Sequence, residues 1–247
     1  MGKDYFSNRM TVRNFSDRRV PDHVLTDIIE RAMRAPTCGN MQLYSVIVTR
    51  ESAMKSRLSA MHFNQPASTG SDVILTICAD FQRFSRWCEL SAATPCYNNF
   101  HSFISALTDA VIFSQQIVTI AEMEGLGTCY LGTVNYNAAD ISSLLELPDM
   151  VVPVASLAIG YPIYDERQVE RLPVEAVLHF EKYRHDTDED LLSLFRAKEE
   201  FPDNKKFIKE NNKPSLASVF TDIRYSKEMN EKVSHEFIQL LRDKKFL

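Results

Sequence analysis

The amino-acid sequence predicts a mixed fold of the α/β or α+β class, in which helices cover both faces of a sheet. Helix-like and strand-like segments alternate over the first 160 residues, and apolar residues make up 45% of the chain. A long segment at 101–124 is apolar almost all round, which is typical of a central helix. Alternation of this kind indicates strands packed between helices.

Periodicity and helix-breaking residues define the individual elements. After Pro21, apolar residues recur at helical spacing as far as Met33, and Pro36 ends this helix. Ser91 to Phe100 contains Pro95 and reads as a loop, whose aromatic residues form either a lid over a site or interface packing. The other expected elements are strands at 43–49, 72–79, 129–131 and 151–159 and helices at 51–61, 81–90, 101–124 and 138–147.

Composition excludes several classes of protein. The net charge of −5 gives no general attraction to nucleic acid or to anionic membranes. No run approaches about 18 continuous apolar residues, so we expect no membrane-spanning helix. The N-terminus lacks the apolar core of a signal peptide, and a cytoplasmic location is expected. The cysteines form no CxxC pair and the histidines are scattered, so neither a disulfide framework nor a metal site is predicted.

The charge distribution divides the chain. Residues 181–247 hold 14 basic and 14 acidic residues, whereas the first 180 hold 14 and 19. We therefore expect a core domain at 1–180 and a charged C-terminal extension at 181–247. The extension consists either of solvated surface helices or of an arm that wraps a neighbouring subunit.

Two polar segments are candidates for ligand binding. Arg9, Thr11 and Arg13 recur at a spacing of two, so in an extended chain they project to one side and form a clamp suited to phosphate. The alternative is an exposed strand edge. In the second segment, 35–42, the amides of Asn40 and Gln42 can read the edge of a heterocycle, although turn chemistry alone also explains the composition.

A glycine-rich segment at 125–132 follows the long helix and opens a strand. It is therefore not the dinucleotide fingerprint, in which the glycines follow a strand and open a helix. Gly125 and Gly127 can be an ordinary helix end, whereas Gly132 at the end of a strand permits close approach of backbone to a ligand. Gly160 to Pro162 and Arg171 follow the last strand. No hydrolase motif is present, and no catalytic side chain is predicted.

Taken in order, these segments resemble the FMN-dependent nitroreductase family, in its oxygen-insensitive nitroreductase and flavin reductase branch. FNQP at 63–66, CADFQR at 78–83 and RLP at 171–173 support that branch. The resemblance covers roughly residues 5–180. It implies an α+β three-layer sandwich with a central, mostly antiparallel sheet and a C-terminal extension. It also implies an obligate homodimer with two FMN sites at the interface.

The resemblance implies roles for particular residues. Arg9, Thr11 and Arg13 match the element that holds the FMN phosphate and pyrimidine side, and Arg171 matches a phosphate-binding arginine. Cys38 stands where the family commonly has serine, and Val169 where related sequences have a basic residue, which removes one phosphate contact. The implied FMN-binding residues are Arg9, Met10, Thr11, Arg13, Pro36, Thr37, Cys38, Asn40, Gln42, Gln65, Tyr130, Leu131, Gly132, Thr133 and Arg171.

The activity that the resemblance implies is an NAD(P)H oxidoreductase. Hydride would pass from NADPH or NADH through flavin N5 to a small nitroaromatic, quinone or flavin acceptor, with ping-pong kinetics. No catalytic protein residue and no metal are required. The alternatives are the same fold acting as a reductive dehalogenase or dehydrogenase on one metabolite, or a flavin-binding dimer without catalysis.

Overall fold

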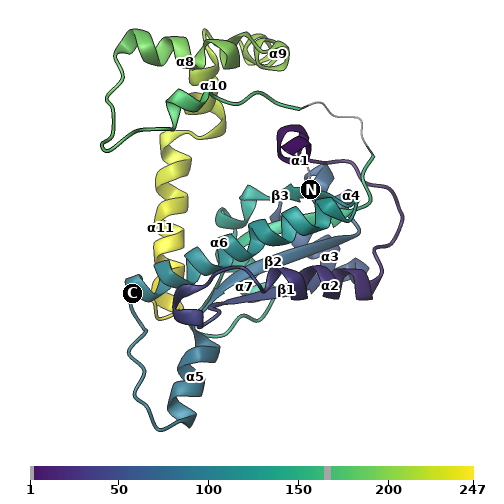
Figure 1. Cartoon of the computed structure of the whole chain (residues 1–247), viewed down its shortest axis with the longest axis vertical. Coiled ribbons are helices and arrows are strands. Elements are labelled where there is room, and N and C mark those ends of the chain that lie inside the picture. Colours follow the sequence, from purple (N-terminus) through teal and green to yellow (C-terminus); the bar gives the residue numbers. More distant parts are fainter. Residues whose placement is uncertain (1–2, 164–167) are drawn as a thin grey trace. The chain divides into compact units, whose positions relative to one another are not determined.

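The structure is a computed structural model that describes residues 3–163 and 168–247 (Figure 1). The chain divides into two compact units, which are described separately. The smaller unit comprises Met1–Met10 and Arg167–Lys232, and the larger comprises Thr11–Glu166 and Val233–Leu247. The larger unit contains the sheet and most of the buried core.

Four antiparallel strands form the sheet in the order β1-β2-β4-β3. Every residue of the two inner strands, β2 and β4, is buried. The strands are β1 (Tyr44–Thr49), β2 (Val73–Asp80), β3 (Gly127–Tyr130) and β4 (Val151–Gly160). The four strands expected from the sequence are confirmed to within about two residues at each end, and so is the antiparallel sheet.

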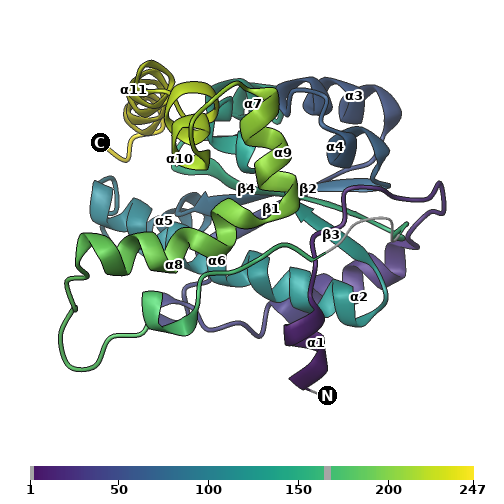
Figure 2. The same cartoon turned by 90° about the horizontal axis from the view of Figure 1, so that it is seen from above.

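Helices cover both faces of this sheet, as Figure 2 shows. Val73, Leu75 and Ile77 of β2 pack in the core cluster on one face, whereas the intervening Ile74 joins the cluster on the other. The α+β three-layer sandwich is therefore confirmed. One face carries α2 (Asp22–Ala32) and α6 (Phe100–Met123), the other carries α3 (Ser52–Met61), α4 (Pro66–Gly70) and α7 (Ala138–Leu144), and α5 (Gln82–Leu90) follows β2.

Two boundaries differ from the sequence expectation for local reasons. The helix expected to reach residue 147 ends at Leu144, because Glu146 takes a left-handed conformation with φ of 52°. α6 begins at Phe100, where the side chain of Asn99 accepts the Ser102 N–H and caps the helix. The ring of Tyr97 in the preceding loop stacks on Phe81 at 4.6 Å between centroids.

Helix α6 is the central helix of the larger unit. One side is buried against β1, β2 and β4, while Ile104, Val111 and Ile112 on the other side are each more than a third exposed. By length and composition alone α6 could cross a membrane, which the sequence analysis did not foresee. Half of its most apolar 18-residue window is buried, a feature that core helices of globular proteins share.

The C-terminal end of the chain packs into the main core. Phe246 is fully buried, with its ring 5.4 Å from that of Phe103, and Leu240 and Leu241 of α11 (Lys227–Asp243) join the same cluster. The carbonyl of Lys244 accepts the N–H of Met150 at 2.9 Å. The charge pattern of residues 181–247 does not foresee this contribution to the core.

The smaller unit consists of short helices joined by polar contacts. Glu170 accepts hydrogen bonds from Lys198 and Asn204, and the Glu199 carboxylate accepts the N–H of Leu216. A mainly apolar cavity of about 340 Å³ lies between α8 and α10. The elements are α1 (Lys3–Asn8), η3 (Val174–Ala176), α8 (Asp188–Glu200), α9 (Pro202–Glu210), α10 (Leu216–Val219) and η4 (Phe220–Arg224).

Gly127 makes room for the N-terminal segment of the larger unit. A Cβ at this position would lie 2.8 Å from Cγ1 and 2.9 Å from Cβ of Val12. The N–H of Val12 donates to the carbonyl of Thr128 at 3.0 Å, so the two segments run side by side. Any side chain at residue 127 must displace Val12 and, with it, Thr11 and Arg13.

We predict that Gly127→Ala destabilises the protein by about 1–3 kcal/mol, the usual cost of overpacking a filled core. Measured against Val12→Ala alone, the further loss in the double variant Gly127→Ala/Val12→Ala should be smaller, because Val12→Ala removes the clashing Cγ1 and leaves only Cβ. Urea unfolding measures the free energy of unfolding of each variant. Equal stability of Gly127→Ala and the unmodified protein would contradict this account of the glycine.

Candidate functional site

The segment Thr11–Arg13 has the alternation that its spacing predicts. Val12 is 5% exposed and packs in the core, whereas Thr11 and Arg13 on either side lie outside it. Pairing of Val12 with Thr128 attaches the segment to β3. A hydroxyl and a guanidinium therefore stand next to the strand that leads to Gly132.

The other predicted phosphate ligands belong to the smaller unit. The side-chain amide of Gln168 donates to the carbonyls of Ser7 at 2.6 Å and Arg9 at 3.2 Å, which brings the segment before Met10 beside the stretch that leads to Arg171. The Arg171 guanidinium donates to the Glu170 carbonyl at 2.9 Å. Within this unit the two arginines thus come from adjoining stretches of chain.

The loop that carries Asn40 and Gln42 has an unusual backbone. Gly39, Asn40 and Gln42 all have left-handed φ values, of 54°, 57° and 54°, next to the short helix η1 (Cys38–Asn40). Left-handed conformations cost little for glycine and more for glutamine. Tertiary contacts must therefore hold this loop, which also contains Pro36, Thr37 and Cys38.

One group that holds the loop is the buried carboxylate of Asp109 on α6. One oxygen accepts the N–H of Cys38 at 2.8 Å and the other accepts the N–H of Leu43 at 3.2 Å. Asp109 is 1% exposed. The carboxylate, by hydrogen bonding and charge, raises the pKa of the Cys38 thiol, with burial as a further cause. A raised pKa leaves less of the reactive thiolate at a given pH.

The segment Tyr130–Thr133 borders an apolar cavity. Tyr130 ends β3, its hydroxyl is 2.9 Å from that of Ser114, and Leu131 is buried. Gly132 begins η2 (Gly132–Asn135), and a Cβ built there would meet no atom within 4 Å. The cavity, of about 430 Å³, is lined by Val111, Ser114, Gln115, Tyr130, Leu131, Gly132, Val134, Asn135, Val154, Ala155 and Ser156.

This cavity has the features that the ring of FMN requires. Its walls are mainly apolar, and the backbone at Gly132 faces open space instead of packed atoms. The Ser156 hydroxyl is fully buried and has no hydrogen-bond partner among the described residues. Together with Thr11 and Arg13 beside β3, these residues form a donor set that fits a phosphorylated, planar cofactor.

The turn between α3 and α4 carries Gln65, the last predicted ligand in this unit. Gln65 caps α4, and the two residues before it, Phe63 and Asn64, have left-handed φ values. His62, immediately before them, is fully buried and its Nδ1 lies 2.8 Å from Oγ1 of Thr133. The turn is thereby tied to the segment that contains Gly132.

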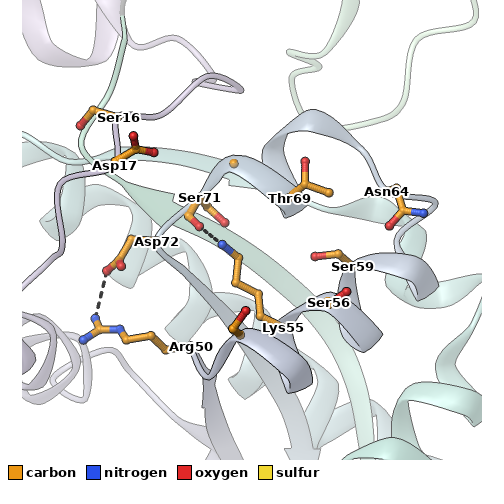
Figure 3. A pocket seen from close by; sticks show the side chains of 12 residues that line it. Ser16, Asp17, Arg50, Lys55, Ser56, Ser59, Asn64, Thr69, Ser71 and Asp72 are labelled. Carbon is orange, nitrogen blue, oxygen red and sulfur yellow. Dashed lines mark hydrogen bonds and ion pairs between the residues drawn. The ribbon is translucent and has the colours of Figure 1, made fainter.

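A second cavity of the larger unit, of about 470 Å³, is polar (Figure 3). Lys55 points toward Ser71 and donates to its backbone carbonyl, and Arg50 points toward Asp72, with which it pairs at 3.2 Å. None of the predicted FMN ligands lines this cavity. Arg50 is thus paired with Asp72, and the Asp17 carboxylate also lines the cavity, so the negative charge of these groups disfavours a phosphate there.

Sequence reasoning missed Asp109 and His62. Asp109 had a detectable signal, because it is the one acidic residue in the apolar stretch 100–121, and a buried carboxylate needs hydrogen-bond donors. His62 had no such signal in the sequence, since a histidine next to a turn is usually exposed. Its role depends on a partner 71 positions further along the chain.

We predict that Asp109→Asn shifts the reactivity of Cys38. Loss of the negative charge should lower the thiol pKa toward its ordinary value, so the pH profile of alkylation by iodoacetamide should move to lower pH. Stability should fall by about 1–3 kcal/mol, because the asparagine amide can accept only one of the two backbone N–H groups. Cys38→Ser identifies the alkylated thiol, and an unmoved profile would contradict the assignment.

Comparisons with known proteins identify the family of this chain. A model of the nitroreductase family matches residues 6–83 and 96–161. An FMN reductase [NAD(P)H] from Bacillus subtilis is 31% identical to this protein, and the match covers 92% of this chain and 94% of the relative. A Cr(VI) reductase from a Pseudomonas species is 30% identical, and the match covers 79% of this chain and 80% of the relative. A Bacteroides fragilis crystal structure, provisionally assigned as an oxidoreductase, is 44% identical over 99% of both chains, with a TM-score of 0.97. The chain belongs to the nitroreductase family.

Proposed function

We propose that this protein is an FMN-dependent oxidoreductase that passes electrons from NADPH or NADH to small acceptors. The observation that carries the proposal is the cavity at Gly132, where exposed backbone borders an apolar space after the end of β3, the strand that Val12 joins by a hydrogen bond. Relatives that cover most of the chain are named as reductases of FMN and of Cr(VI), which supports the same chemistry.

Different residues would bind the phosphate and the ring of FMN. Thr11 and Arg13 would supply a hydroxyl and a guanidinium, which are donors that a phosphate prefers. Arg9 and Arg171 stay candidates for the same role by resemblance. The backbone from Tyr130 to Thr133 would lie along the ring, and Gln65 would offer an amide to its polar edge. Bound FMN supplies a carrier of two electrons, and guanidinium groups near the ring stabilise the negative charge of its reduced form.

A homodimer is part of the proposal. Ile104, Val111 and Ile112 are exposed on one side of α6, and Val111 also borders the cavity at Gly132. An apolar stripe on a central helix is suited to pairing with its own copy about a twofold axis. The partner's Pro36–Gln42 loop would then approach the ring. Of the extension 181–247, only the part before Val233 would be an arm on the partner, because the rest packs into this chain's own core. The expected location is the cytoplasm, and the partners are small-molecule acceptors.

The first test of the function is a steady-state assay. The purified protein should be yellow or take up FMN, and should oxidise NADPH or NADH with nitrofurazone, menadione or free FMN as acceptor. Double-reciprocal plots at several acceptor concentrations should be parallel, because both substrates use the same face in turn. A protein that binds no FMN, or that oxidises neither nicotinamide with any acceptor, would contradict the proposal.

Arg13→Ala tests the phosphate clamp. Loss of a charge-assisted hydrogen bond of about 1.5–3 kcal/mol should weaken FMN binding by roughly 10- to 150-fold. Riboflavin, which lacks the phosphate, should bind the variant and the unmodified protein alike. Arg86→Ala, an exposed arginine of α5, is the matched control. Unchanged FMN affinity in Arg13→Ala would remove this residue from the site.

Charged substitutions on the exposed side of α6 test the proposed dimer interface. Val111→Glu/Ile104→Glu should give a monomer in analytical ultracentrifugation, because it places charges in the centre of the proposed interface. Leu90→Glu on α5, which replaces an apolar residue that is more exposed than either of these two, should leave the dimer intact. A dimer that survives the α6 substitutions would place the interface elsewhere.

A further inference from the structure

Three contacts join the turn after α3 to the segment after β3. The Asn137 side-chain amide donates to the Met61 carbonyl at 2.6 Å, and the rings of Phe63 and Tyr136 meet edge to face at 6.3 Å. Between these two contacts, His62 Nδ1 lies 2.8 Å from Thr133 Oγ1. The turn leads into Gln65 and the segment begins with Gly132, so the contacts connect two parts of the proposed FMN site.

The imidazole of His62 is neutral at physiological pH. The side chain is fully buried, and this burial lowers its pKa from 6.5 to about 4. A neutral imidazole has one N–H donor and one acceptor nitrogen. Which nitrogen is protonated depends on the partners that each one has.

The partners favour a proton on Nδ1. Nε2 is buried and has no hydrogen-bond partner in the described part of the chain. A proton there would leave a buried N–H unsatisfied, which is rarer in proteins than an acceptor without a donor. With the proton on Nδ1, His62 donates to Thr133 Oγ1. The Thr133 hydroxyl then accepts from His62 and keeps its own proton for another acceptor.

We propose that His62 is a positioning residue that reserves the Thr133 hydroxyl as a hydrogen-bond donor to the flavin ring. The inference rests on the proposed function, because Thr133 is part of the Tyr130–Thr133 segment assigned to the ring. Thr133 is partly exposed and has no second side-chain partner among the residues described. It is not itself in the lining of the 430 Å³ cavity, but it stands between Gly132 and Val134, which are. A donor at the ring favours the reduced flavin, which carries more negative charge.

The experiment measures the FMN midpoint potential and the flavin absorption spectrum. Thr133→Val removes the hydroxyl at nearly constant volume, and His62→Leu removes the donor behind it. Each should lower the affinity for reduced relative to oxidised FMN about tenfold, which for a two-electron couple is about 30 mV. The double variant should shift no further than the larger single one, because His62 acts through Thr133.

Conservative substitutions separate positioning from general support of the fold. Thr133→Ser keeps the hydroxyl and should keep the potential, and His62→Asn retains an N–H near the Nδ1 position and should recover part of the shift. His185→Leu, at an exposed histidine of the smaller unit, is the control for loss of an imidazole. If His62→Leu does not fold, Thr133→Val and Thr133→Ser still decide the result.

The possible failures are distinguishable. If the unmodified protein binds no FMN, both the proposed function and this inference fail. If it binds FMN but Thr133→Val leaves the potential and spectrum unchanged, the inference alone is overturned. Additive shifts in the double variant would also overturn it, because they would mean that His62 acts independently of Thr133.

Discussion

The architecture of the larger unit depends on the burial of one side of α6. This helix packs across β1, β2 and β4, and its inner residues join those of the strands in a single cluster. The same helix carries Asp109, so a position fixed by apolar packing also fixes the carboxylate that holds the 38–43 loop. The apolar packing of α6 therefore also fixes the position of the Asp109 carboxylate, and with it the hydrogen bonds to the 38–43 loop.

Most helices and strands of the larger unit could be predicted, because the sequence patterns that define them are local. Period-two and period-3.6 patterns and breakers such as Pro36 define a strand or helix from a few neighbouring residues. The ends of α7 and α6 were less predictable, since they depend on the left-handed backbone of Glu146 and on the Asn99 cap. Helix α4 was missed because five residues are too few to show periodicity.

The site was predictable in part, and from resemblance more than from residue patterns. The alternation around Val12 and the open space at Gly132 follow from spacing and from the absence of a side chain. Asp109 and His62 depend on partners far away in the sequence, at Cys38, Leu43 and Thr133. No local pattern encodes such pairs. The assignment of individual residues to FMN remains a prediction.

Pro153 on the inner strand β4 has a consequence for how the sheet assembles. Ile77 pairs with Ala155 and Cys78 with Pro153, so Val154 is an extra residue in the ladder, at the position next to a residue that has no N–H to donate. β2 and β4 are about seventy residues apart, and flexible segments of uniform apolar character can slip relative to each other. Alignments that place Pro153 where the ladder needs an N–H donor are disfavoured, so Pro153 helps to fix the register of these two strands.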